Sequence, residues 1–157
     1  MYYDDKVIQP FYGIDDIKIG DNYNSVIGKL KSHKIIYSSG VNPNKGCTPE
    51  VAWTTIYIKN YMELVFAKDV LWRIDFLENF AGKLENNIKI GMDLSMALAI
   101  DKELEYDDWN EEFYSKKGYW LIDSLETGKI VTIFIGIKEI LNDDEFDSYN
   151  WVEKYKK

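Results

Sequence analysis

The sequence predicts an α+β fold in one domain, residues 1–157, built of two tandem repeats, about 14–83 and 84–141, and a charged C-terminal tail. Three observations predict it. Ile17-Lys18-Ile19-Gly20 recurs as Ile88-Lys89-Ile90-Gly91, an offset of 71 residues. Apolar residues at helical spacing follow each copy, and runs with strand-like alternation follow each helix. We expect two helix-plus-antiparallel-strand repeats that form one body, with the helices covering one sheet face.

The residues after each Ile-Lys-Ile-Gly segment match the start of a helix. Asn22 and Asp93 stand at the N-cap position, where a short polar side chain accepts hydrogen bonds from the first helical N–H groups. In both copies the positions i, i+3, i+4 and i+7 then follow one helical face, and they hold Tyr23, Val26, Ile27 and Leu30 in the first and Leu94, Ala97, Leu98 and Asp101 in the second. Each copy therefore predicts a short amphipathic helix.

Strand patterns follow the first helix. A short apolar run at 34–37 and a turn-rich stretch at 38–49 precede strand candidates at 51–59, 61–67 and 70–76. Alternation places Glu63, Arg73 and Asp75 on the face opposite the apolar side chains of the last two strands, which include Met62, Leu64, Phe66, Val70, Trp72, Ile74 and Phe76.

The second half repeats the scheme, with strand candidates at 111–115, 119–125 and 129–137 and a hairpin turn at 126–128. The tail, 142–157, mixes charged and aromatic residues and gives no clear secondary-structure prediction.

The charge is unevenly distributed. The chain has 27 acidic and 19 basic residues, a net charge of −8, and residues 1–90 carry 11 of each sign. Residues 91–157 hold 16 acidic and 8 basic residues, so the whole excess lies there. Direct binding to nucleic acid or to an anionic membrane is disfavoured, and a basic protein is the natural partner. The plain alternative is an acidic surface that keeps the protein soluble.

Few residues of the chain are suited to catalysis or to metal binding. His33 is the single histidine, beside lysines at a helix end, which excludes sites that need two histidines. Cys47 is the single cysteine, so no internal disulfide forms, which indicates a reducing compartment. The acids of 143–147 resemble the start of a calcium loop, but Ser148 stands where the turn requires glycine. We predict no catalytic residue, no metal and no cofactor; an enzyme would need a carboxylate pair of perturbed pKa in a concave pocket.

The chain start, MYYDDKVIQP, shows no signal-peptide pattern, and no stretch reaches 18 uncharged apolar residues. Together with the lone cysteine, this predicts a cytoplasmic protein.

An acidic and aromatic segment is the candidate partner-binding site. Tyrosine and tryptophan give large contact areas at binding hot spots, and neighbouring carboxylates steer a basic partner. The alternative is that Trp109 and Phe113, four residues apart, both pack in the core. The residues that we predict to bind the partner are Asp101, Glu103, Glu105, Tyr106, Asp107, Asp108, Trp109, Glu111 and Glu112.

The tandem units, each a helical start followed by antiparallel strands, resemble the β-lactamase inhibitory protein fold over about residues 14–137. The Ile-Lys-Ile-Gly segment before a capped helix is similar to the start of SmpA/OmlA-type modules. In its small size, acidity and Tyr/Trp content the chain is similar to immunity proteins of bacterial toxin systems, including toxin–antitoxin and contact-dependent inhibition systems. The resemblance implies an immunity protein that occludes the active site of a cognate, basic toxin domain. The alternative is a non-catalytic scaffold module with an unknown partner.

Overall fold

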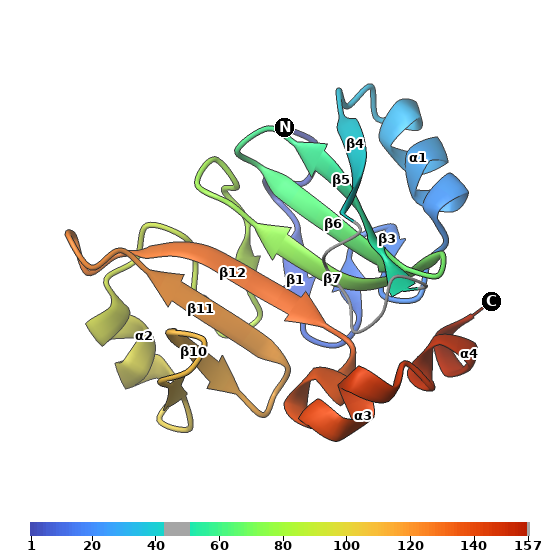
Figure 1. Ribbon diagram of the computed structural model, residues 1–157. Coiled ribbons are helices and arrows are strands. Elements are labelled where there is room, and N and C mark those ends of the chain that lie inside the picture. Colours follow the sequence, from blue (N-terminus) through green and yellow to red (C-terminus); the bar gives the residue numbers. More distant parts are fainter. Residues whose placement is uncertain (43–50, 157) are drawn as a thin grey trace.

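The computed structural model describes residues 1–42 and 51–156, and within them the protein is mostly β structure arranged as two sheets. The larger sheet is antiparallel throughout, in the order β4-β5-β6-β7-β12-β11-β10-β9. The smaller sheet, in the order β3-β2-β1-β8, lies behind the larger one in Figure 1. The strands of the larger sheet are β4 (Ser38–Asn42), β5 (Trp53–Ile58), β6 (Met62–Ala67), β7 (Val70–Phe76), β9 (Glu105–Asp107), β10 (Glu112–Ser115), β11 (Tyr119–Asp123) and β12 (Ile130–Gly136).

The remaining elements are short. The strands of the smaller sheet are β1 (Val7–Gln9), β2 (Gly13–Ile14), β3 (Ile17–Lys18) and β8 (Lys83–Leu84). The helices are α1 (Tyr23–Ser32), α2 (Leu94–Ile100), the 3-10 helix η2 (Lys138–Leu141), α3 (Asp143–Ser148) and α4 (Trp151–Tyr155). Within the described ranges, no helix is long and apolar enough to cross a membrane.

The expectation of an α+β fold with helices covering one sheet face is wrong. Helix α1 buries only Val26 and Leu30, and α2 buries only Ala97, so the helices offer too little apolar surface to cover eight strands. The smaller sheet contributes fully buried Ile8 and Ile14 to the common core instead. Its strands are two or three residues long, too short for alternation to appear in the sequence.

Most of the longer predicted elements are confirmed. Helix α1 begins after Asn22, whose side-chain oxygen accepts a hydrogen bond of 2.8 Å from the Ser25 N–H. Asp93 precedes α2 but makes no side-chain cap, and its carboxylate lies 3.1 Å from Lys129 Nζ instead. The six expected strands correspond to β5, β6, β7, β10, β11 and β12. The expectations for 34–42 are wrong, because the apolar run forms no strand and β4 lies in the stretch expected to be turns.

The larger sheet consists of two four-strand meanders, β4–β7 and β9–β12, joined where β7 pairs with β12. At this junction residues 73–76 pair with residues 133–136. The sheet therefore runs without a break from one half of the chain to the other, as Figure 1 shows.

The two Ile-Lys-Ile-Gly segments make the same backbone contacts. The Gly20 N–H donates to the Leu71 carbonyl, near the start of β7, and the Gly91 N–H donates to the Ile130 carbonyl, at the start of β12. Both glycines have positive φ, 92° and 86°. The segments that the sequence paired thus share a local geometry, while the tandem repeat as a whole stays a prediction.

Alternation along the strands gives the larger sheet two unlike faces. The face toward the smaller sheet, which we name the covered face, has buried side chains in neighbouring strands: Ile56, Leu64, Ile74, Ile135 and Tyr119. On the opposite face, which we name the open face, the next row across the strands is Tyr57, Glu63, Asp75, Phe134, Trp120, Tyr114 and Glu105.

The C-terminal tail covers one end of the open face, where Phe146 of α3 packs against Trp72 with a ring-centroid distance of 4.8 Å. Trp72 reaches this face because a β-bulge in β6–β7 leaves it without an opposite residue, since Val65 pairs with Arg73 and Phe66 pairs with Leu71. Its ring also packs against Trp53, with a centroid distance of 4.7 Å. The prediction that Trp72 shares a face with Ile74 is therefore wrong, and the bulge is the reason.

Candidate functional site

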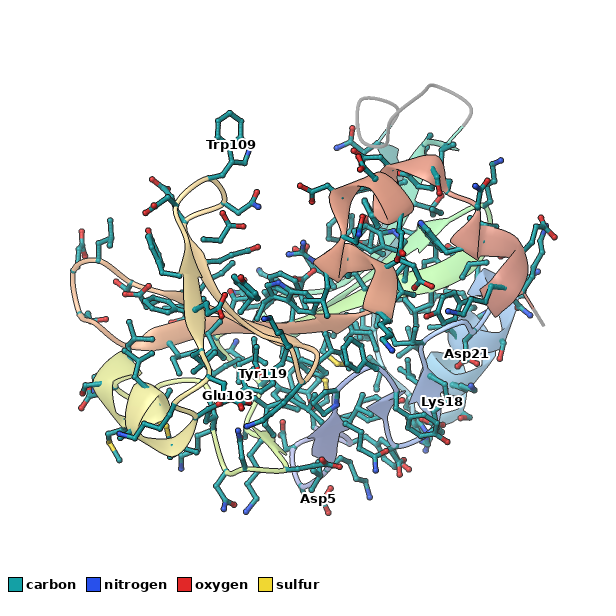
Figure 2. The ribbon with its side chains drawn as sticks, turned by 90° about the horizontal axis from the view of Figure 1, so that it is seen from below. Asp5, Lys18, Asp21, Glu103, Trp109 and Tyr119 are labelled. Carbon is teal, nitrogen blue, oxygen red and sulfur yellow. The ribbon has the colours of Figure 1, made fainter. Side chains whose placement is uncertain are left out.

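The open face is hollowed between two raised walls. Figure 2, which views the sheet from below, shows the β9–β10 hairpin with Trp109 at its tip on one side and α3 and α4 on the other. A cavity of about 510 Å³ lies between the walls. Its lining consists of Tyr106, Asp107, Asp108, Trp109, Tyr114, Trp120, Ile140, Leu141 and Asp143.

The hairpin wall presents Trp109 on an ordered turn. The Asp107 carboxylate accepts hydrogen bonds from the Trp109 N–H at 2.9 Å and from the Asn110 side-chain amide at 2.8 Å. These bonds, the one from Asn110 first, hold the pKa of Asp107 below its usual range. The Trp109 side chain itself is 92% exposed, so the turn fixes its backbone while its ring stands in solvent.

The opposite wall depends on a glycine. Gly136 ends β12, and a Cβ there would lie 2.3 Å from Ile140 Cδ1 and 2.7 Å from the Trp72 carbonyl oxygen. The missing side chain lets η2 cross directly over the sheet. Buried Glu139 then ties η2 to α4, because its carboxylate accepts hydrogen bonds from Lys154 Nζ at 2.7 Å and from the Tyr155 hydroxyl at 2.9 Å.

Trp120 in the lining of the groove begins an aromatic stack that continues along the open face to the Arg73 guanidinium. Phe134 and Trp120 stack with a centroid distance of 5.0 Å and an interplanar angle of 4°. The Arg73 guanidinium lies 3.7 Å from the Phe134 centroid, within range of a cation–π contact. Arg73 also donates to the Asp75 carboxylate from both Nε and Nη2, with a shortest distance of 2.7 Å.

Two further carboxylates near Arg73 have perturbed pKa values. Burial raises the pKa of Glu63, Asp75 adds to this effect and Arg73 opposes it. Burial also raises the pKa of Glu112, to about 7, where Asp107 and Asp75 add and Arg73 opposes. In the part of the chain that the structure describes, neither Glu63 nor Glu112 has a hydrogen-bond or ion-pair partner for its carboxyl group. The open face thus holds negative charge that is partly removed from water.

The structure brings most of the predicted partner-binding residues to this groove. Tyr106, Asp107, Asp108 and Trp109 line it. Glu105 and Glu112 lie on the open face beside it, and Glu105 accepts a hydrogen bond from the Tyr114 hydroxyl. Glu103 and Glu111 are exposed but do not line the cavity. Of the two aromatics that could pack inward together, Phe113 packs against the core and Trp109 does not.

Asp101 is placed differently, because it is only 2% exposed. Its carboxylate accepts hydrogen bonds from the Tyr119 hydroxyl, the Glu103 N–H and Lys117 Nζ. Burial alone would raise the pKa of Asp101, but these bonds outweigh it and hold the pKa below the usual range. Asp101 therefore anchors the end of α2 to the sheet and offers no surface to a partner.

Sequence reasoning missed the centre of the open face, which is formed by Glu63, Arg73, Asp75, Trp120 and Phe134. The signal was present for three of them, since alternation placed Glu63, Arg73 and Asp75 opposite apolar neighbours. The sequence did not show, however, that this face of the sheet is left uncovered.

Of the other candidates considered from sequence, Asp143 lines the groove and His33 does not. His33 Nε2 lies 2.8 Å from an Asp16 carboxylate oxygen, and its ring stacks on Tyr2. The acids of 143–147 lie on helix α3, and the described residues contain no group of three or more His, Cys, Asp or Glu side chains arranged to hold a metal ion. Cys47 lies outside the described residues.

No protein-family model, curated protein or solved structure matches the chain.

Proposed function

We propose that the protein is an immunity protein or inhibitor, which binds a cognate, basic toxin domain on the open face and occludes its active site. The observation that carries the proposal is Trp109, which is 92% exposed on a turn held by Asp107 at the rim of a 510 Å³ groove. The proposed partner resides in the same cytoplasm, and no catalytic residue, metal or cofactor takes part.

Physical reasons support a protein as the occupant. A large aromatic side chain on an ordered turn loses little conformational entropy on binding and gains a large buried area, which is why tryptophan is enriched at hot spots. Asp108 and Asp143 at the rim, with Glu105 nearby, attract a basic surface and accelerate its association.

The test is co-purification of the tagged chain with the product of the neighbouring upstream gene, at low and high salt. We expect a one-to-one complex in which the toxin is inactive and whose association slows as salt rises. Trp109→Ala should weaken it at least tenfold, about 1.4 kcal/mol or more. Asp108→Lys should slow association.

Two matched controls lie on the β11–β12 turn. Leu125 is as exposed as Trp109, and Leu125→Ala should leave the complex unchanged. Glu126 is an exposed acid outside the groove, and Glu126→Lys controls for net charge. A complex equally sensitive to the control variants would contradict the site. A partner bound without loss of its activity would favour the scaffold alternative, and the absence of any complex would refute the proposal.

A second candidate function, a hydrolase that uses carboxylates, is favoured by one observation. Glu112, whose pKa is raised to about 7, and Glu63, whose pKa is also raised, share an open face rich in aromatic side chains. A carboxyl group that is protonated near neutral pH suits general acid catalysis. Turnover of any substrate in a glycoside panel, lost in Glu112→Gln, would favour this function over binding.

A further inference from the structure

We propose that β4 is a dimerisation edge, where a second copy of this chain adds its own β4 antiparallel to the first and joins the two larger sheets into one. The inference concerns a part of the molecule that the proposed function does not use, and it does not depend on that function. It rests on the difference between the two edges of the larger sheet, on the self-complementarity of β4 and on the distribution of charge.

The two edges of the larger sheet are protected unequally. The outer strands are β4 at one end and β9 at the other, and no described strand pairs with the outer side of either. Strand β9 has three residues, and two of them, Glu105 and Asp107, are acidic, so this short edge repels a second copy. Strand β4 has five residues, Ser-Ser-Gly-Val-Asn, with no charge, no proline and no bulge against β5. None of these common protections of a sheet edge is therefore present on β4 itself.

Strand β4 is also open to solvent. Residues 38–41 are all exposed, and helix α1, which lies on the same side of the molecule in Figure 1, leaves them so. Val41 is 65% exposed, and Ile36, just before the strand, is 90% exposed. The outer side of an edge strand offers backbone N–H and C=O groups to another chain, and exposed apolar side chains beside it gain from the burial that pairing brings.

The sequence of β4 is complementary to itself about Gly40. In an antiparallel pair centred on this glycine, Gly40 faces the same residue of the second copy, and Ser39 of each copy faces Val41 of the other, so no like charges meet. Tyr57 is 40% exposed, and its ring lies 3.9 Å from the place where a Cβ of Gly40 would stand. The two Tyr57 rings, one from each copy, therefore cover the glycine pair, as aromatic side chains do for glycines at other sheet edges.

The distribution of charge favours this edge and this occupant. Residues 1–90 carry 11 acidic and 11 basic residues, and the whole net charge of −8 lies in residues 91–157. Pairing through β4 places the two β9–β12 meanders, which come from the acidic half, at opposite ends of the joined sheet. Repulsion is therefore weaker in this arrangement than in pairing through β9. A basic partner is attracted to the acidic half instead, which leaves β4 to a second copy.

The dimer should be weak and should respond to salt. Pairing of five residues buries much less than the roughly 800 Å² per partner of a standard interface, so we expect a dissociation constant on the order of 100 µM. Salt screens the repulsion between two copies of net charge −8, so dimerisation should strengthen as salt rises. Association with a basic toxin should respond to salt in the opposite direction, which distinguishes the two kinds of complex.

Sedimentation equilibrium of the full-length protein, between about 10 µM and about 1 mM, measures the dimerisation. We expect the average mass to rise with concentration from that of one chain toward that of two. Val41→Lys should weaken the dimer at least about tenfold, because a lysine on an edge strand opposes pairing. The matched control is Leu125→Lys, on the β11–β12 turn, which makes the same change of charge at an apolar residue that is 96% exposed. It should leave the dimer unchanged.

Cysteine cross-linking tests the register, with Cys47 replaced by serine in every variant. Gly40→Cys should form a disulfide between two copies in oxidised glutathione, because opposite residues of an antiparallel pair have Cα atoms about 4.5–5.5 Å apart, within the range of a disulfide. A Cβ at this position has room, since its nearest neighbour is the Tyr57 ring. Ser38→Cys is the control and should not cross-link, because the two copies of residue 38 lie about 14 Å apart in this register.

Three results would each overturn the dimer: an average mass that stays at that of one chain at about 1 mM, equal loss of dimer in Leu125→Lys and Val41→Lys, or equal cross-linking of the two cysteine variants. All three leave the proposed function standing, because the toxin complex does not use β4. Conversely, a β4-dependent dimer without any toxin complex would remove the proposed function and keep the dimer.

Discussion

The two faces of the larger sheet differ although the same strands supply both. On β7, Ile74 and Phe76 are fully buried on the covered face, while Arg73 and Asp75 alternate with them and lie on the open face. Four consecutive residues thus alternate between the core and the candidate binding surface. The covered face buries apolar side chains, whereas the open face keeps partly desolvated carboxyl groups, Glu63 and Glu112, whose raised pKa values show that their ionisation is unfavourable there. The proposed binding function would account for charged residues that folding alone does not require.

The largest expected effect tests the covered face. Ile74→Ala should lower the free energy of unfolding by about 3 kcal/mol, because it leaves a cavity in a fully buried site. Tyr57→Ala on the open face should cost less than about 1 kcal/mol, since that side chain is already 40% exposed. Urea denaturation measures the free energy of unfolding of both variants. A similar decrease in the two variants would contradict the difference in burial between the two faces.

The next effect concerns a carboxylate on the covered side. Asp101→Asn should cost about 2 kcal/mol at pH 7, because a buried, hydrogen-bonded charge is replaced by a weaker acceptor. The folded-state pKa of Asp101 is lowered, so its stabilisation is complete above its unfolded-state pKa of about 3.9 and is lost as pH falls through the folded-state pKa. Denaturation at pH 7 and below pH 4 checks this. Exposed Glu103→Gln is the control and should show no such trend.

On the open face, ionisation of Glu112 should have the opposite effect on the free energy of unfolding. The pKa of Glu112 is raised, so its ionisation destabilises the fold progressively as pH rises from its unfolded-state pKa of about 4.3 through about 7. Glu112→Gln should therefore stabilise the protein at pH 8.5 by about 1 kcal/mol, after allowance for partial exposure, and change little at pH 4.5. Thermal denaturation at the two pH values measures it. Destabilisation at pH 8.5 would show that Glu112 holds the fold together.

The smallest effect is expected at the rim. Trp109→Ala should alter the free energy of unfolding by no more than about 0.5 kcal/mol, because the ring contributes almost no burial. The same variant should remove the most solvent-like component of the tryptophan fluorescence. A clear loss of stability would mean that Trp109 packs against the protein in solution, and the groove would lose its anchor.

Sequence reasoning recovered the fold unevenly. Alternation and spacing found α1 and six of the eight strands of the larger sheet, since each of these elements is long enough to repeat its period. The smaller sheet was invisible because β2, β3 and β8 are two residues each, and their pairing is set by tertiary contacts. Strand β4, with the sequence Ser-Ser-Gly-Val-Asn, has poor strand propensity and forms because β5 pairs with it.

The sequence predicted only part of the candidate site, because only part of it is formed by residues that are neighbours in the sequence. The density of acids and aromatics marked the β9–β10 hairpin, which is local in sequence. Asp101 was predicted to bind the partner together with its neighbours although it is buried. The density of acidic residues along a sequence does not show which of their side chains point into the protein. Arg73 and Glu112 are brought near each other only by the junction of β7 with β12, which no local pattern reports.

That junction has a mechanical consequence. Residues 73–76 and 133–136 form the only strand pairing between the two meanders in the described parts of the chain. A pulling force that shears β7 against β12 therefore loads these few backbone hydrogen bonds first. We expect the sheet to part at this seam before either meander unravels.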